Sequence, residues 1–130
     1  MKIHESEVRV RYQETDNMGV VYYSNYLVWF EIARTEYFRA LGLVYRKLEE
    51  KGIYLMVAAI SCKYKSPAKY DDIVRMQAWI SELKNSSLKF EYKLFVGDKL
   101  IATGDSIHVF TNSEGRPRRI PEEVRNLFHP

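Results

Sequence analysis

The chain has 130 residues, 46% hydrophobic and 28% charged, which is ordinary for a globular protein with one core and excludes an intrinsically disordered chain. Its formal net charge of +3, from 20 basic and 17 acidic residues, is too balanced for a protein whose main role is to coat DNA. The single cysteine, Cys62, excludes an internal disulfide and a cysteine-based zinc cluster, and it fits a reducing cytoplasm.

Neither a targeting signal nor a membrane span is expected. The N-terminal MKIHESEVRVR has no apolar core after its charged residues, so it does not read as a secretory signal peptide. The longest mostly apolar run, MGVVYYSNYLVWFEIA, is too short and too polar to cross a bilayer. We therefore expect a cytoplasmic protein that forms a single domain over residues 1–130.

The first elements in chain order are a strand, a turn and a long helix. Val8, Val10 and Tyr12 alternate with polar residues, which predicts a half-buried strand. The TDNMG turn at residues 15–19 follows, and then the period changes. A helix is expected over residues 24–41, capped by Ser24 or Asn25 and ended by Gly42, because apolar residues recur there at helical spacing: Tyr26, Phe30, Ala33, Tyr37 and Leu41.

The first two turns of this helix are apolar on nearly every side, so something is expected to wrap it. After a short polar helix at residues 44–52, the period-2 runs predict four strands at residues 53–65, 74–83, 88–96 and 99–111, followed by a short terminal helix within residues 120–128. Gly97 and Asp98 form a two-residue hairpin signal. The pattern predicts an α+β fold in which a five-stranded antiparallel sheet wraps around one long central helix.

Several apolar residues are expected to point away from the helix, namely Ile73, Trp79, Phe95 and Ile101. A single curled sheet would leave them in water, so we expect a homo-oligomer, either a dimer or a tetramer. Cys62 alternates with Ile60 and Tyr64 and is expected to be a core residue.

Two segments carry a resemblance to a known family: VRVRYQETDNMGVVYYSNYLVWFEIARTEYFRALG, which begins at Val8, and YKSPAKYDDIV, which begins at Tyr64. They resemble the 4-hydroxybenzoyl-CoA thioesterase family, and within it the bacterial acyl-CoA thioesterases associated with the Tol–Pal system. The resemblance implies a hot-dog fold, often a homotetramer, that hydrolyses an acyl-CoA to the free acid and CoA. It implies no metal and no organic cofactor.

By position, the resemblance places the family's catalytic carboxylate at Asp16. It also places at Tyr23 the backbone amide that polarises the thioester carbonyl. Many members of the subgroup have a histidine where this chain has Tyr23, so only a backbone role carries over. Further substrate contacts fall on a set of positions near the helix start and in the KNSS turn: Gly19, Val20, Tyr22, Ser24, Asn25, Lys84 and Ser87.

Elementary chemistry agrees with this assignment. The first turn of a helix presents unpaired N–H groups and a positive dipole end, which suit the oxyanion formed during thioester hydrolysis. Asp16 precedes that turn and has two possible catalytic roles, nucleophile or general base. The alternative is that Asp16 only closes an Asx-turn.

Other catalytic groups are weaker candidates. Glu31 and Glu36 on the helix are expected to form ion pairs, Glu31 with Arg34. Ser106 lies in a strand without a nucleophile-elbow motif, and the histidines, His4, His108 and His129, lack ligand spacing.

Two alternatives to a thioesterase stay open. The first is a non-catalytic module that binds acyl-CoA or acyl carrier protein. The second, nucleic-acid binding, is disfavoured because KFEYKLF reads as one buried and one solvated strand face. The sequence leaves open the acyl-chain preference, since aliphatic and aromatic groups are equally compatible with it.

Overall fold

A computed structural model describes residues 2–128 of the chain. Its elements, in chain order, are β1 (His4–Arg9), the 3-10 turn η1 (Tyr12–Glu14), α1 (Asn25–Ala40), α2 (Tyr45–Glu50), β2 (Tyr54–Tyr64), β3 (Ile73–Leu83), β4 (Ser87–Val96), β5 (Lys99–Thr111) and α3 (Glu122–Phe128). The predicted five-stranded antiparallel sheet and long helix are confirmed. His129 lies outside the described residues.

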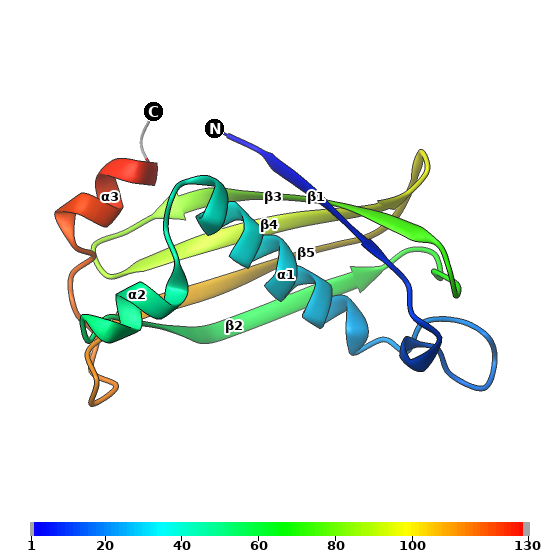
Figure 1. Cartoon of the computed structure of the whole chain (residues 1–130), viewed down its shortest axis with the longest axis horizontal. Coiled ribbons are helices and arrows are strands. Elements are labelled where there is room, and N and C mark those ends of the chain that lie inside the picture. The colour runs from blue at the N-terminus through cyan, green and yellow to red at the C-terminus, as the bar shows by residue number, and fades with distance from the viewer. Residues whose placement is uncertain (1, 129–130) are drawn as a thin grey trace.

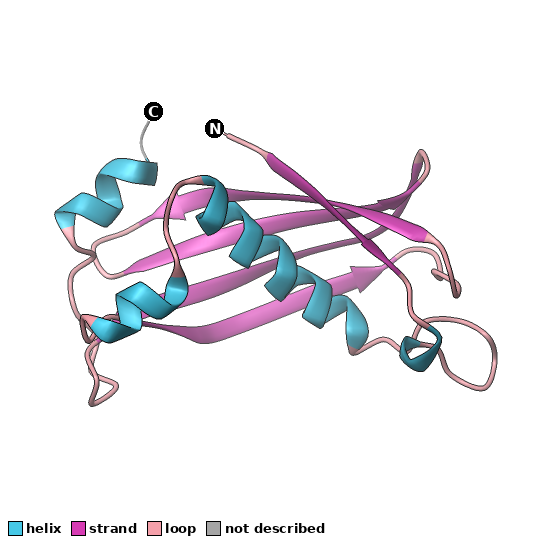
Figure 2. Ribbon diagram, in the orientation of Figure 1, coloured by secondary structure: helices cyan, strands magenta, loops and turns pink. Residues whose placement is uncertain are grey.

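The strand order is β1-β3-β4-β5-β2, so β1 and β2 form the two edges of the sheet. Figure 1 shows α1 lying across one face of this sheet, while α2 sits near the start of β2 and α3 lies beyond the β3–β4 turn. Figure 2 shows α1 and α2 together on that one face. The face beneath α1 therefore holds the core.

The core forms where the inner face of α1 meets β3, β4 and β5. Phe30 stacks on Tyr92 with 4.3 Å between ring centroids and 7° between ring planes. Phe38 meets Phe90 edge to face at 5.4 Å. Large aromatic side chains bury much apolar area, so these contacts fix how α1 sits on the sheet.

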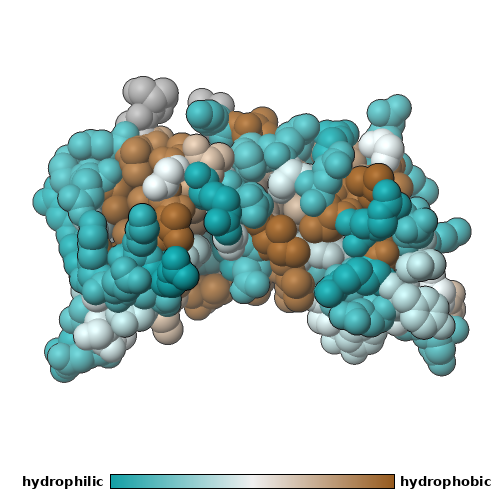
Figure 3. Space-filling view, in the orientation of Figure 1, coloured by the Kyte–Doolittle hydropathy of each residue, from teal (hydrophilic) through white to brown (hydrophobic). Residues whose placement is uncertain are grey.

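Enclosure of α1 is less complete than its composition predicts. Val28 and Glu31 lie on a side of the helix that the chain leaves exposed. Figure 3 shows a hydrophobic patch near the middle of this view, where α1 and β2 lie in Figure 1. One chain thus covers α1 on its sheet side only.

The first strand differs from the predicted one. It begins at His4 and ends at Arg9, because its partner β3 starts at Ile73, opposite Arg9. Tyr12, expected in the strand, is exposed in η1 instead.

Ile101 is buried rather than outward-facing. The β4–β5 register shifts there, with Leu94 opposite Ala102 and Phe95 opposite Leu100. The extra residue breaks the alternation of faces, so Ile101 and Ala102 are both buried. A strict period-2 alternation in the sequence does not predict this bulge.

The expected burial of the Ile60, Cys62 and Tyr64 set is also wrong. Cys62 is only half-buried, and Ile60 and Tyr64 are exposed. The reason is topological, since β2 is an edge strand that contacts β5 alone among the described strands. Within residues 2–128, no helix has the length and apolar character needed to cross a bilayer.

Gly104 allows α1 to approach the sheet closely. A Cβ at this position would collide with the Phe30 ring and lie 2.6 Å from the carbonyl oxygen of Ser61. We expect Gly104→Ala to lower the free energy of unfolding by about 1–3 kcal/mol, because a packed core resists an added methyl group. Urea denaturation followed by circular dichroism measures the change.

The matched control is Thr103→Ala, one residue away on the opposite face of β5. It should change stability by less than about 0.5 kcal/mol. Wild-type stability in Gly104→Ala would contradict the close approach of Phe30.

Candidate active site

A tight loop precedes α1 and carries Asp16. Thr15 and Val21 pair across its base, and Gly19 adopts a φ of 82°, which a residue with a side chain rarely adopts. The Asp16 N–H donates to the Val20 carbonyl at 2.8 Å. The loop therefore returns the chain to the start of the helix soon after Asp16.

The Asp16 carboxylate has one oxygen engaged in the loop. Its Oδ1 accepts from the Met18 N–H at 2.8 Å and from the Val20 N–H at 3.4 Å. This is the Asx-turn role considered for the residue. No hydrogen bond to Oδ2 occurs within residues 2–128, and the residue is half-buried, so Oδ2 is free to act on a ligand.

The start of α1 presents free N–H groups. The Tyr22 N–H donates to the Glu14 carbonyl at 2.9 Å, but in the described part of the chain the N–H groups of Tyr23 and Ser24 have no acceptor. Tyr23 is 58% exposed. Two adjacent N–H groups at the positive end of a helix can hold a developing oxyanion.

The expected side-chain cap is absent from this helix start. Ser24 makes no side-chain cap hydrogen bond. Asn25 donates through Nδ2 to the Glu14 carbonyl at 2.9 Å instead. Neither side chain therefore competes for the Tyr23 and Ser24 N–H groups.

A hollow of about 340 Å³ lies beside these groups. Aromatic rings of Tyr23, Tyr26 and Tyr64 line it, and Tyr64 meets Tyr26 edge to face at 5.0 Å. The Tyr64 hydroxyl donates to the Tyr23 carbonyl at 3.1 Å. Burial, followed by the neighbouring Cys62, raises the pKa of Tyr64 to about 12, so its hydroxyl stays protonated and keeps this bond.

Glu14 is a residue of this region that sequence reasoning missed. It is only 5% exposed. Its carboxylate accepts from the Trp29 indole N–H at 3.2 Å and from the Arg11 backbone N–H at 2.8 Å. It thereby joins the segment before the loop to the second turn of α1. In the run QETD it looks like an ordinary solvated turn residue, and only the buried Trp29 shows otherwise.

Lys84 and Ser87 are not brought to Asp16 within one chain. Lys84 lies in the β3–β4 turn and Ser87 begins β4, and the Lys84 N–H donates to the Ser87 carbonyl at 2.8 Å. Figure 1 shows this turn beside α3, at the opposite end of the sheet from the loop that precedes α1. One chain thus keeps Lys84 and Ser87 apart from the Asp16 loop.

Of the two helix carboxylates, Glu36 forms an ion pair as expected and Glu31 does not. Glu36 pairs with Arg39 at 3.5 Å. The expected Glu31–Arg34 pair is wrong, because Arg34 points inward and donates to the Tyr92 hydroxyl at 3.1 Å. Arg34 therefore belongs to the interior and leaves Glu31 at the surface.

Ser106 and His108 were expected to be unrelated to any site, yet they form a buried pair. The Ser106 Oγ lies 2.7 Å from His108 Nε2, and the Tyr92 hydroxyl lies 2.5 Å from Ser106 Oγ. Together with Arg34 these residues form a continuous polar chain beneath α1. Across residues 2–128, no cluster of three or more His, Cys, Asp or Glu side chains is placed to hold a metal ion.

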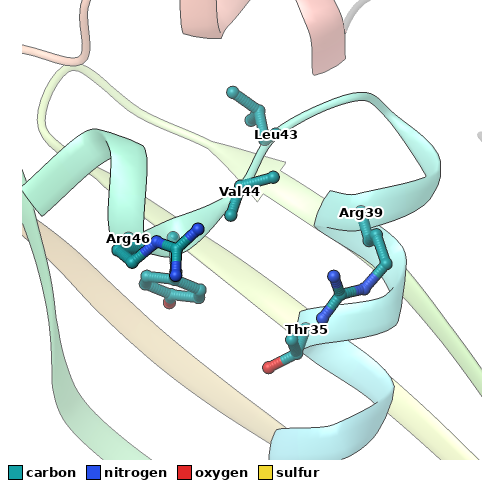
Figure 4. Close-up of a pocket in the computed structure, with 6 residues that line it drawn as sticks. Thr35, Arg39, Leu43, Val44 and Arg46 are labelled. Carbon is teal, nitrogen blue, oxygen red and sulfur yellow. The ribbon is translucent and has the colours of Figure 1, made fainter.

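Two further hollows flank α2. One, of about 330 Å³, lies between α1 and α2, and Figure 4 shows Arg39 and Arg46 extending into it from the two helices. The other, of about 400 Å³, is bounded by α1, α2, β2 and the His108 end of the polar chain. Both lie along the helix away from its free N–H groups.

Comparison with known proteins identifies the family. The model of the thioesterase-like superfamily matches residues 10–128. An acyl-CoA thioesterase from Haemophilus influenzae, YbgC, is 36% identical over 125 residues, which cover 94% of this chain and 91% of that protein. A putative acyl-CoA thioesterase from Bacillus subtilis, YneP, is 34% identical over 115 residues, covering 88% and 83%.

The solved structures agree. DHNA-CoA thioesterase from Staphylococcus aureus has a TM-score of 0.91 and 30% identity, covering 97% of this chain and 86% of that chain. The chain belongs to the thioesterase-like superfamily and has its hot-dog fold. The prediction of a thioesterase is confirmed at this level.

Glu14→Ala tests whether this carboxylate organises the site. We expect it to lower the free energy of unfolding by about 1–3 kcal/mol, because the buried Trp29 N–H and the Arg11 N–H lose their acceptor. Limited proteolysis should also cut the loop before α1 more readily. Glu7→Ala on the exposed side of β1 is the matched control, and equal stability and protection of both variants would contradict the role of Glu14.

Proposed function

We propose that this chain is an acyl-CoA thioesterase, which hydrolyses the thioester to a free acid and CoA. The observation that carries the proposal is the pairing of a free carboxylate oxygen on Asp16 with the unpaired N–H groups of Tyr23 and Ser24, on either side of one tight loop. The names of the Haemophilus and Bacillus relatives support the same substrate class.

In the proposed reaction the thioester carbonyl oxygen accepts from the Tyr23 N–H. The positive end of α1 stabilises the charge that develops on this oxygen. Asp16 Oδ2 either attacks the carbonyl carbon or takes a proton from the attacking water. The CoA thiolate then leaves, and water completes the hydrolysis if an anhydride has formed.

In the proposal, Gly19, Val20 and Tyr22 line the path by which the thioester reaches the Tyr23 N–H. Gly19 matters through its backbone, since its positive φ keeps the loop tight. Lys84 and Ser87 would contact the nucleotide from a second subunit. We also propose that residues 1–130 form one domain, in the Tol–Pal-associated subgroup that its N-terminal motif resembles. The single cysteine favours the cytoplasm.

We further propose that two copies associate through β2. This edge strand exposes a continuous apolar run over residues 56–60, MVAAI, without a charge or proline that would block pairing. An antiparallel strand can pair with its own copy about a two-fold axis, which closes the assembly as a dimer. A tetramer would need a further contact through the outward-facing Trp79 and Phe95.

Such a pairing would bring together two hollows that lie apart in one chain. An axis near the middle of β2 places residues 54–57 of one subunit beside residues 61–64 of the other. The hollow at Tyr64, next to the free N–H groups, then faces the hollow at Leu55 and Val57 of the partner. The thioester and its acyl group would span the two subunits.

Asp16→Asn separates the catalytic role of Asp16 from its turn role. The amide oxygen can still accept from the Met18 N–H, so the loop should keep its shape, but the carboxylate is lost. We expect kcat/KM for acyl-CoA hydrolysis to fall by at least about 100-fold, with unfolding stability changed by less than about 1 kcal/mol. Release of free thiol from a panel of acyl-CoAs is the measurement.

Asp98→Asn, in the β4–β5 turn, is the control for removal of a surface carboxylate. Full activity of Asp16→Asn would reject the catalytic assignment and leave Asp16 as a turn residue. Saturable binding of acyl-CoA without hydrolysis by the wild type would instead favour the non-catalytic binding module.

The dimer is tested by light scattering during gel filtration. The wild type should run at about twice the chain mass of 15.4 kDa. Ala59→Arg places a charge in the apolar run of β2 and should shift the protein toward the monomer, with loss of activity. Ile73→Arg makes the same change at an exposed apolar residue of β3 and should stay dimeric. A wild-type monomer would overturn the proposal.

A further inference from the structure

The hollow between α1, α2 and β2 is large enough for part of a small molecule. Its volume of about 400 Å³ falls within the range of ligand sites. Glu31, Arg34 and Thr35 of α1 line it, together with Tyr45, Glu49, Leu55, Val57 and His108. The lining thus combines the apolar strand residues Leu55 and Val57 with polar side chains, and His108 is one of these polar groups.

The polar chain that ends at His108 is almost entirely buried. Arg34 is 7% exposed, and Tyr92, Ser106 and His108 are at most 1% exposed. Burying these groups is unfavourable unless each is hydrogen-bonded. Among the fully buried side-chain nitrogen and oxygen atoms of these four residues, only His108 Nδ1 has no partner in the described part of the protein.

The direction of the hydrogen bonds along this series of polar side chains follows from which groups can donate. Arg34 is only a donor, so the Tyr92 oxygen accepts from it and the single Tyr92 proton goes on to Ser106. Ser106 then donates its own proton to His108 Nε2. With Nε2 acting as acceptor, the proton of a neutral imidazole lies on Nδ1.

The imidazole is neutral at physiological pH. Burial, and then the positive Arg34, lower the pKa of His108 to about 3. Above that value the ring carries one N–H group. The Arg34 chain therefore holds His108, which lines the hollow, as a fixed donor through its unpartnered Nδ1.

We propose that this hollow receives the distal part of the acyl group and that the His108 Nδ1–H selects acyl groups carrying a neutral oxygen acceptor, a hydroxyl or keto oxygen. This inference rests on the proposed acyl-CoA thioesterase function. Two carboxylates, Glu31 and Glu49, line the hollow against the one guanidinium of Arg34, so a carboxylate on the ligand is disfavoured, whereas a hydroxyl could also donate to Glu31 or Glu49. A plain hydrocarbon leaves the Nδ1–H unpaired, which disfavours its binding.

The test compares octanoyl-CoA with a series of hydroxyoctanoyl-CoAs bearing the hydroxyl on carbons 3 to 8. We expect one position to give a kcat/KM about 10- to 100-fold above that of octanoyl-CoA. His108→Leu, similar in size and without a donor, should bring this ratio close to one. His108→Gln retains an N–H donor and should keep part of the preference.

Thr111→Val is the matched control, since it removes a buried hydroxyl from the same strand outside the hollow. It should leave the ratio unchanged. A preference that persists in His108→Leu, or no preference for any hydroxylated substrate, overturns the inference. Failure of the wild type to hydrolyse any member of the series would instead reject the proposed function.

A second measurement does not depend on activity, and its main readout uses the wild type. Nitrogen-15 NMR of histidine-labelled wild type distinguishes the two neutral tautomers of His108. We expect the proton on Nδ1 from pH 6 to 8, and a shift in the tautomer balance in Ser106→Ala. A proton on Nε2, or a positively charged ring, in the wild type would overturn the donor assignment.

Discussion

The close contact of α1 with the sheet is the constraint on which the other features depend. Phe30 stacks flat on Tyr92 and lies against Gly104, so the helix axis can neither rise nor rotate without losing buried aromatic area. This position fixes where the free N–H groups of the helix start lie relative to the Asp16 loop. It also turns Arg34, one turn beyond Phe30, into the interior, where it begins the polar chain to His108.

Glu14 ties the segment that carries Asp16 to the position of α1. Its carboxylate accepts from Trp29 on α1, and its carbonyl accepts from Tyr22 and Asn25 at the helix start. Through both its side chain and its backbone, Glu14 therefore holds the segment before Asp16 against the helix. A loop held in this way can present a carboxylate at a fixed place without reorganisation during the reaction, which is how preorganised sites lower a barrier.

Much of the fold could be predicted because local periodicity and turn chemistry agree along the chain. The helix start, the Gly42 stop and the β3–β5 meander follow from spacing and glycine placement. Ile101 and the exposed face of β2 could not be predicted. A bulge breaks the alternation at Ile101, and an edge position depends on strand order, which no run of residues encodes by itself.

The sequence by itself determined the elements, the family resemblance and the two candidate groups Asp16 and Tyr23, because these reside in contiguous motifs. Only the tertiary structure decided that one oxygen of Asp16 is engaged in the loop and that Glu14 is buried. It alone joined Arg34, Tyr92, Ser106 and His108 into one directed chain. The physical reason is that hydrogen bonds between residues 58 positions apart arise from packing, which places side chains together regardless of their distance along the chain.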